Sequence, residues 1–276
     1  MYFRPSTIDE ALEYLARGGV TIVAGGTDFY PARVGKAPDE DVLDITGVAA
    51  LRGISDEGAQ LRLGAGLRWS ALLDPPLPPW LRCLVLAARE IGGRQVQNSG
   101  TVVGNLCNAS PAADGIPCLL ALDASVELRS RQGMRTLPIA EFVLGNRRTA
   151  LQSGELATAI VIPKSRGAAG STFLKLGARR YLVISIAMVA ALVETGPDGI
   201  VTAARVAVGA CSAVAQRLML LEAALRGRKL GRGIGGVVAD EHLEPLMPID
   251  DIRGTAAYRR DAARTLVARA IEELVP

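Results

Sequence analysis

Two glycine-containing segments offer the clearest chemistry in this 276-residue chain. Residues 23–28 (VAGGTD) follow a run of β-branched residues, and residues 101–114 (TVVGNLCNASPAAD) lead from a strand-like stretch through a Gly-Asn corner into a loop of small residues. Glycine lets a ligand approach the backbone closely, and successive N–H groups in a turn form a concavity that binds anions. Two such corners predict a diphosphate held mainly by main-chain N–H groups, and therefore a nucleotide cofactor.

Side chains beside these corners could add contacts to such a ligand. Thr27 supplies a hydroxyl, Asn105 an amide, and Asp114 a carboxylate that can bond to ribose or ribityl hydroxyls. A single glycine pair after a strand is usually an ordinary turn, so the prediction rests on the two corners together and on the small polar residues of the second segment. Asp114 has an alternative role as the N-cap of a helix that begins near Ile116.

Other motifs for catalysis or metal binding are weak or missing. The chain has no G-x-x-x-x-G-K-[ST] phosphate loop, and residues 231–236 (GRGIGG) lack the preceding strand of a dinucleotide fingerprint, so we predict a surface loop there. His242 is the only histidine, and a surface or structural role is predicted for it rather than catalysis. No C-x-x-C pattern joins the cysteines, so neither disulfides nor a metal site is expected. For the cysteine of the second corner, Cys107, we expect a buried packing role.

Composition narrows the class of protein. Basic and acidic residues are interspersed, the formal net charge is +3, and no Lys/Arg block marks a nucleic-acid surface. Neither a secretory signal nor an apolar stretch long enough to cross a bilayer is visible, so we expect a cytoplasmic protein without a membrane span. The length and the 49% share of hydrophobic residues allow two or three small domains.

Hydrophobic periodicity predicts alternating helices and strands over the first 55 residues. A helix capped by Ser6 or Thr7 precedes strands at residues 20–24 and 41–45, which indicates a small parallel sheet. Beyond it we predict strands at residues 60–67, 125–130, 135–137 and 158–162, and helices at 69–73, 81–91 and 116–122. The Pro-rich residues 74–80 should end the first of these helices, and residues 96–104 should lead into the second corner as a strand-like stretch.

A change of composition predicts a boundary near Pro163 and the Gly/Ala/Ser segment 165–171. The last third then alternates or runs apolar in the manner of a sheet with covering helices. Its predicted elements are strands at residues 173–176, 186–194 and 205–209, a hairpin turn at 196–199, and helices at 216–225 and 255–274.

Five ordered segments match one family pattern across the whole chain. Residues 23–28 are similar to A-G-G-[TH]-[DS], residues 101–105 to T-[IV]-G-G-N, and residues 108–114 to N-A-x-P-x-x-D. Residues 173–180 (FLKLGARR) are similar to a K-x-x-x-R strand, and residues 250–260 (DDIRGTAAYRR) to a D-x-R-[GS]-[ST]-x-x-Y-R helix start. The chain therefore resembles the FAD-binding (medium) subunits of the molybdenum hydroxylases, such as those of xanthine dehydrogenase and carbon monoxide dehydrogenase.

The resemblance implies FAD as the cofactor and an α+β fold in three parts. A small parallel α/β subdomain (1–55) and a mixed sheet with helices (56–165) would clasp FAD, and a C-terminal domain of antiparallel sheet and helices (166–276) would cover the flavin. Lys175 would approach the flavin or its ribityl chain, although a solvated strand lysine is the alternative. Val103 departs from the pattern, because many relatives carry a glycine there. The predicted cofactor-binding residues are Val23, Ala24, Gly25, Gly26, Thr27, Asp28, Thr101, Val102, Gly104, Asn105, Asp114 and Lys175.

The resemblance also implies partner chains. They are a [2Fe-2S] iron–sulfur small subunit and a molybdopterin-binding large subunit, assembled as a heterohexamer of two three-subunit units. Electrons would pass from the iron–sulfur clusters through FAD to an external acceptor, so this oxidoreductase subunit would hold no catalytic residue of its own and would be incomplete alone. Two alternatives stay open: a stand-alone FAD-dependent oxidase, for which the chain offers no obvious base, and a non-catalytic flavin- or nucleotide-binding scaffold.

Overall fold

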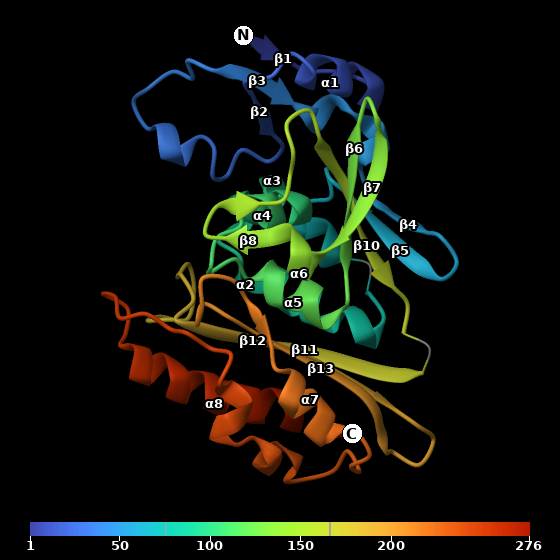
Figure 1. The fold of residues 1–276 in the computed structure, drawn as a ribbon, viewed down its shortest axis with the longest axis vertical. Helices are drawn as coiled ribbons and strands as arrows, with labels where there is room; N and C mark the ends of the chain where they lie inside the picture. Colours follow the sequence, from blue (N-terminus) through green and yellow to red (C-terminus); the bar gives the residue numbers. More distant parts are fainter. Residues whose placement is uncertain (75, 166) are drawn as a thin grey trace.

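The computed structural model describes residues 1–74, 76–165 and 167–276 and shows three regions stacked along the longest axis of the molecule (Figure 1). A small parallel sheet lies at the N-terminal end, an antiparallel sheet with a group of helices lies in the middle, and a second antiparallel sheet with its own helices lies at the C-terminal end. The predicted α+β class is confirmed. Pro75 and Arg166 lie outside the described residues, and with them parts of the predicted Pro-rich break and of the predicted boundary.

The N-terminal region is a three-stranded sheet in the order β1 (Tyr2–Phe3), β3 (Asp41–Asp44), β2 (Val20–Val23), with both pairs parallel. The helix α1 (Ile8–Leu15) begins at Thr7, whose hydroxyl accepts the Glu10 N–H, while the Glu10 carboxylate accepts N–H groups in return. This reciprocal capping box and the buried apolar face of α1 explain why a helix forms at the predicted place. The predicted parallel sheet is also present. Three short 3-10 helices complete the region: η1 (Pro31–Arg33), η2 (Ile45–Gly47) and η3 (Ala49–Leu51).

The middle region holds a five-stranded sheet in the order β4 (Ile54–Asp56), β5 (Gln60–Gly64), β10 (Leu156–Pro163), β6 (Ser125–Ser130), β7 (Gly133–Pro138). All of its described pairs are antiparallel, where a mixed sheet was expected, because β10 returns from far along the chain to insert between β5 and β6. The other elements of the region are η4 (Trp69–Leu72), η5 (Pro79–Leu81), α2 (Arg82–Glu90), α3 (Arg94–Ser99), α4 (Val102–Asn108), α5 (Gly115–Ala121), α6 (Ile139–Phe142) and a hairpin of β8 (Val143–Gly145) with β9 (Arg148–Thr149).

The prediction for residues 96–104 of this region is also wrong. Residues 96–104 were expected to be strand-like, but they end α3 and begin α4. Thr101 is the N-cap of α4, and its hydroxyl accepts the Gly104 N–H at 3.0 Å. Val102 and Val103 have β-branched side chains that favour strands in isolation, yet both are buried in the core, and this tertiary packing overrides their local preference.

The C-terminal region is an antiparallel sheet in the order β11 (Ala168–Leu176), β12 (Ala187–Thr195), β13 (Val201–Gly209), β14 (Gln216–Arg217). One face carries α7 (Met219–Leu225) and α8 (Ala256–Glu272), with η6 (Ile234–Val237) and η7 (Asp240–Leu243) beside them, and the other face packs on α2 and α5 (Figure 1). Because both faces are covered, the strands are nearly continuous apolar runs. Gln216 and Arg217 belong to a strand, so the helix predicted at 216–225 begins only at Met219.

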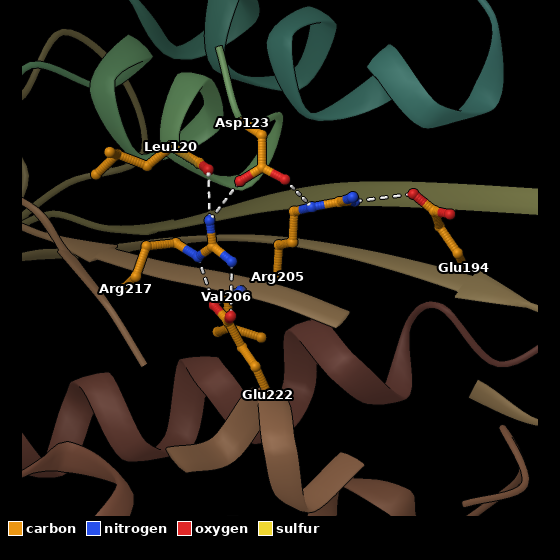
Figure 2. A network of polar contacts seen from close by, with 7 residues as sticks. All are labelled: Leu120, Asp123, Glu194, Arg205, Val206, Arg217 and Glu222. Atoms are coloured by element: carbon orange, nitrogen blue, oxygen red, sulfur yellow. Dashed lines mark hydrogen bonds and ion pairs between the residues drawn. The ribbon is translucent and has the colours of Figure 1, made fainter. Parts of the chain in front are cut away.

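A polar network joins the end of α5 to this sheet (Figure 2). Asp123 lies just after α5 and accepts a hydrogen bond from Nη1 of Arg217 at 2.7 Å, and it also forms an ion pair with Arg205. Arg217 donates from the same nitrogen to the Leu120 carbonyl at 3.1 Å and from its other nitrogens to both carboxylate oxygens of Glu222. The network fixes the C-terminal end of α5 against the C-terminal sheet.

No helix in the described ranges combines the length and apolar character needed to cross a membrane.

Candidate cofactor-binding site

A cavity of about 500 Å³ lies where the loop after β2 meets α3, α4 and the β8–β9 hairpin. Its volume is in the range usual for small-molecule sites. Nine of the twelve predicted cofactor-binding residues line it: Val23, Ala24, Gly25, Gly26, Thr27, Asp28, Thr101, Gly104 and Asn105. The structure therefore brings the two glycine-containing segments together around one space, although they are far apart in sequence.

The first segment offers backbone donors to this cavity. Within the described part of the chain, the N–H groups of Gly25, Gly26 and Thr27 donate to no backbone or side-chain acceptor. Gly26 has φ +68°, a conformation that glycine adopts without strain. Successive unpaired N–H groups form an anion-binding concavity, so three consecutive donors without acceptors on residues that line a cavity indicate a place for an anionic ligand.

Close backbone contact explains the glycine at position 25. A Cβ atom on Gly25 would lie 2.1 Å from the Ser99 carbonyl oxygen, so no side chain fits there. A Cβ atom on Gly100 would lie 3.0 Å from the Val96 carbonyl oxygen and 3.2 Å from the Thr27 hydroxyl oxygen. These two glycines let the loop after β2 rest directly on the backbone between α3 and α4.

The second segment is built differently, because its N–H groups are mostly occupied. The Val102 N–H donates to the Leu67 carbonyl at 3.0 Å, the Gly104 N–H to the Thr101 hydroxyl, and the Asn105 N–H to the Thr101 carbonyl at 3.0 Å. In this helix start, the N–H groups of Thr101 and Val103 have no acceptor among the described residues. Gly104 makes room for the capping hydroxyl, since a Cβ atom there would lie 2.7 Å from the Thr101 hydroxyl oxygen.

A chain of polar side chains crosses the cavity wall from the first segment to the hairpin. The Asn108 amide donates from Nδ2 to Oδ1 of Asp28 at 3.0 Å, and its Oδ1 accepts from Nη1 of Arg147 at 3.1 Å. Asn108 and Arg147 both line the cavity, as does Arg33. Arg33 is already engaged, because it pairs with Glu40 and donates to the Phe29 carbonyl.

Asp114 and Lys175 do not line the cavity; they form a buried ion pair beside it. Nζ of Lys175 donates to Oδ2 of Asp114 at 2.6 Å, and the Ser185 hydroxyl donates to Oδ1 at 2.6 Å. Burial raises the pKa of Asp114, while Lys175 and Ser185 act in the opposite direction. Lys175 is thus not a solvated strand lysine, and Asp114, although at the N-cap position of α5, makes no capping bond with its side chain.

The remaining candidates have structural roles. Burial raises the pKa of Cys107 to about 12, so this residue of the cavity wall holds a thiol rather than a nucleophilic thiolate. His242 is buried, and its Nδ1 accepts the Ala239 N–H. The loop at 231–236 packs on α8, where the N–H groups of Gly233 and Gly235 donate to Glu272. Among the described residues, no three His, Cys, Asp or Glu side chains could hold a metal ion.

Four polar residues of the cavity were not predicted from the sequence: Thr21, Arg33, Asn108 and Arg147. Asn108 stands inside the second segment and could have been included. No local signal marks Arg147, because the β8–β9 hairpin brings it to Asn108 from 39 positions further along the chain. Val102, which was predicted, does not line the cavity, because its side chain is buried and its N–H is already bonded to Leu67.

Comparison with protein families matches residues 1–165 to the FAD binding domain in molybdopterin dehydrogenase. Residues 172–274 match the CO dehydrogenase flavoprotein C-terminal domain. The chain is 28% identical to the nicotine 6-hydroxylase medium subunit of Paenarthrobacter nicotinovorans, over 99% of this chain and 96% of that one. It is also 28% identical to the carbon monoxide dehydrogenase medium chain of Hydrogenophaga pseudoflava, over 98% and 95% of the two chains.

Solved structures share the fold. A carbon monoxide dehydrogenase from Hydrogenophaga pseudoflava that lacks the Mo-pyranopterin moiety of its cofactor superposes with a TM-score of 0.90, at 28% identity over 99% of this chain and 96% of that one. The quinoline 2-oxidoreductase of Pseudomonas putida 86 gives a TM-score of 0.89, at 26% identity over 99% and 96%.

Proposed function

Because the chain belongs to the FAD-binding subunits of the molybdenum hydroxylase family, with FAD as its cofactor and an oxidoreductase activity, we propose that its FAD occupies the cavity beside β2. The diphosphate would accept hydrogen bonds from the N–H groups of Gly25, Gly26 and Thr27. The observation that carries this assignment is that three consecutive residues lining the cavity have N–H groups without an acceptor in the described chain.

The cavity wall fits the rest of such a cofactor in its chemistry. Apolar side chains from β2, α3 and the middle sheet, such as Ile22, Val96 and Leu156, offer contact to a flat ring system. When bound, FAD supplies the redox chemistry, and the protein supplies binding, orientation and electrostatics. From the start of α4, the second segment would add the N–H groups of Thr101 and Val103, which have no acceptor in the described chain and belong to residues that line the cavity.

Asp114 and Lys175 are proposed to act from behind the cavity wall. Asn105 lines the cavity, and a Cβ atom on Gly115 would lie 2.8 Å from its Oδ1, so the residue that follows Asp114 packs against the cavity wall. Each Asp114 oxygen accepts one bond already and keeps a second lone pair, to which a ribityl hydroxyl could donate. Lys175 is proposed to approach the flavin or its ribityl chain from behind the wall, with its charge balanced by Asp114.

The chain is proposed to work within a larger complex. Its relatives are named as medium subunits or medium chains, which supports assembly with other subunits. The proposed partners are a [2Fe-2S] iron–sulfur small subunit and a molybdopterin-binding large subunit, in a heterohexamer of two three-subunit units. Electrons would enter from the iron–sulfur clusters, pass through FAD and leave to an external acceptor. A cytoplasmic location remains a prediction.

The visible spectrum of the purified chain tests the assignment. Two flavin bands with one FAD per chain are expected, whereas a colourless protein that FAD does not reconstitute would favour the scaffold. The chain alone should oxidise no N-heterocycle or aldehyde, and addition of the iron–sulfur and molybdopterin subunits should restore that oxidation. Turnover of such a substrate by the single chain, free of iron and molybdenum, would favour the stand-alone oxidase instead.

A further inference from the structure

Arg147 brings a positive charge to the cavity wall that no described carboxylate neutralises. Arg33 and Arg147 are the two cationic residues of the wall, and Arg33 is paired with Glu40. Arg147 forms no ion pair with any described residue, and its Nε and Nη2 atoms donate to no described acceptor. An exposed arginine with unused donors at the edge of a cavity is suited to an anionic ligand.

Asn108 and Asp28 hold this arginine in position. Asn108 must turn its Nδ2 donor toward the Asp28 carboxylate, and its Oδ1 acceptor is therefore fixed toward the guanidinium. The neutral amide also separates the negative charge of Asp28 from the guanidinium, so Arg147 keeps its charge for a ligand. Asp28 is the next residue after Thr27, so this short chain of contacts links Arg147 to the segment whose N–H groups have no acceptor in the described chain.

The backbone at Arg147 is unfavourable for an arginine. Its φ is +54°, in the left-handed region where glycine is preferred, and its N–H donates to the carbonyl of Ala109, whose own φ is +47°. Strained residues of this kind persist where the surrounding structure holds them, and they cluster at ligand sites. A glycine would form the same hairpin turn without strain but would bring no charge.

We propose that Arg147 binds the diphosphate of FAD through its guanidinium, opposite the N–H groups of Gly25, Gly26 and Thr27, and that Asp28 positions it through Asn108. This inference rests on the proposed function and deepens it. Planar guanidinium groups match pairs of phosphate oxygens, and the two negative charges of the diphosphate supply the partner that Arg147 lacks among the described residues. Asp28, predicted as a direct ligand, becomes a positioning residue in this arrangement.

The test compares three ligands of the flavin-free chain: FAD, ADP and riboflavin, of which riboflavin has no phosphate. The variant Arg147→Met should weaken FAD and ADP binding by about 10–100-fold, the loss expected for hydrogen bonds to a charged group, and should leave riboflavin binding unchanged. Arg148→Met is the matched control, because Arg148 is the exposed neighbour in β9 that does not line the cavity, and it should bind all three ligands as the natural chain does.

A second variant separates binding from folding. Arg147→Gly removes the charge and relieves the positive φ, so its urea midpoint should be equal to or above that of the natural chain while FAD and ADP affinity falls. Normal FAD and ADP binding by either folded variant would overturn the role of Arg147, and so would an equal loss of riboflavin. If the natural chain itself binds no FAD, the proposed function fails, which is a different result.

Discussion

The two glycine-containing segments look alike in sequence but serve the cavity in different ways. After β2, Gly25, Gly26 and Thr27 leave their N–H groups free of acceptors in the described chain, while the N–H groups of Gly104 and Asn105 at the start of α4 are bonded within the protein. The difference lies in the local structure around each glycine. The first segment is a loop at the end of a parallel strand. The second is the capped start of a helix, where the Thr101 hydroxyl accepts the Gly104 N–H. The first segment is thus built for a ligand, and the second mainly supports it.

The largest effect is expected where the first segment rests on the backbone at Ser99 and Gly100, just before the second segment. Gly25→Val would place its Cβ atom against the Ser99 carbonyl, so the loop must move away from the backbone between α3 and α4. FAD should then be lost during purification, because the donors no longer face the cavity. The flavin-to-protein ratio measures this. Gly231→Val is the control, since nothing lies within 4 Å of a Cβ atom there, and full FAD content in Gly25→Val would contradict the role of the contact.

The carboxylate that ends the second segment should matter first for stability. Asp114→Ala would leave the charge of Lys175 buried without its partner, a change that typically costs about 3–5 kcal/mol. Urea unfolding of the flavin-free chain should show the loss, and the double variant Asp114→Ala/Lys175→Met should recover part of it. If Asp114→Ala is as stable as the natural chain, water must reach Lys175 and solvate its charge, and the ion pair is not buried in solution.

FAD titration of Asp114→Ala addresses its second proposed role. If Asp114 also accepts a bond from a ribityl hydroxyl, its affinity for FAD should fall by more than its affinity for ADP. Equal losses for both ligands would limit Asp114 to holding the C-terminal sheet.

The hydroxyl in the first segment should act on the ligand. Thr27→Val keeps the size of the side chain but removes the donor, so FAD affinity should fall by about tenfold, the effect of one hydrogen bond to a charged group. The urea midpoint of the flavin-free chain should not fall, because Thr27 donates no bond within the described protein. Fluorescence titration measures the affinity, and an unchanged dissociation constant would remove the hydroxyl from the site.

The hydroxyl in the second segment should act on the fold. Thr101→Val removes the acceptor for the Gly104 N–H and should cost about 1 kcal/mol of unfolding free energy, the usual value of an N-cap. FAD affinity should change less than in Thr27→Val. The two threonine variants therefore test directly whether the first segment serves the ligand and the second the fold. If Thr101→Val lowered FAD affinity and Thr27→Val lowered stability, the roles of the two segments would be the reverse.

The first segment was predicted well from the sequence, because a run of β-branched residues followed by Gly25-Gly26 usually forms a strand that ends in a turn. It predicted the second less well because Thr101 and Gly104 suit a helix start as well as a strand corner, and burial of Val102 and Val103 decided between them. Most strands of both antiparallel sheets were found, since long apolar runs are a strong signal. The place of β10 between β5 and β6 and the arrival of Arg147 at the cavity depend on long-range packing that no local pattern records.

In the proposed site, the N–H groups of Gly25, Gly26 and Thr27 bind the diphosphate of FAD. Amide NMR of the isotope-labelled, flavin-free chain during titration with ADP tests it most directly, because ADP carries the diphosphate without the flavin ring. We predict large downfield shifts of the Gly25, Gly26 and Thr27 amide protons, with small shifts at Gly104 and Asn105, whose N–H groups already have acceptors. Saturation by ADP with unshifted amides at residues 25–27 would contradict the account.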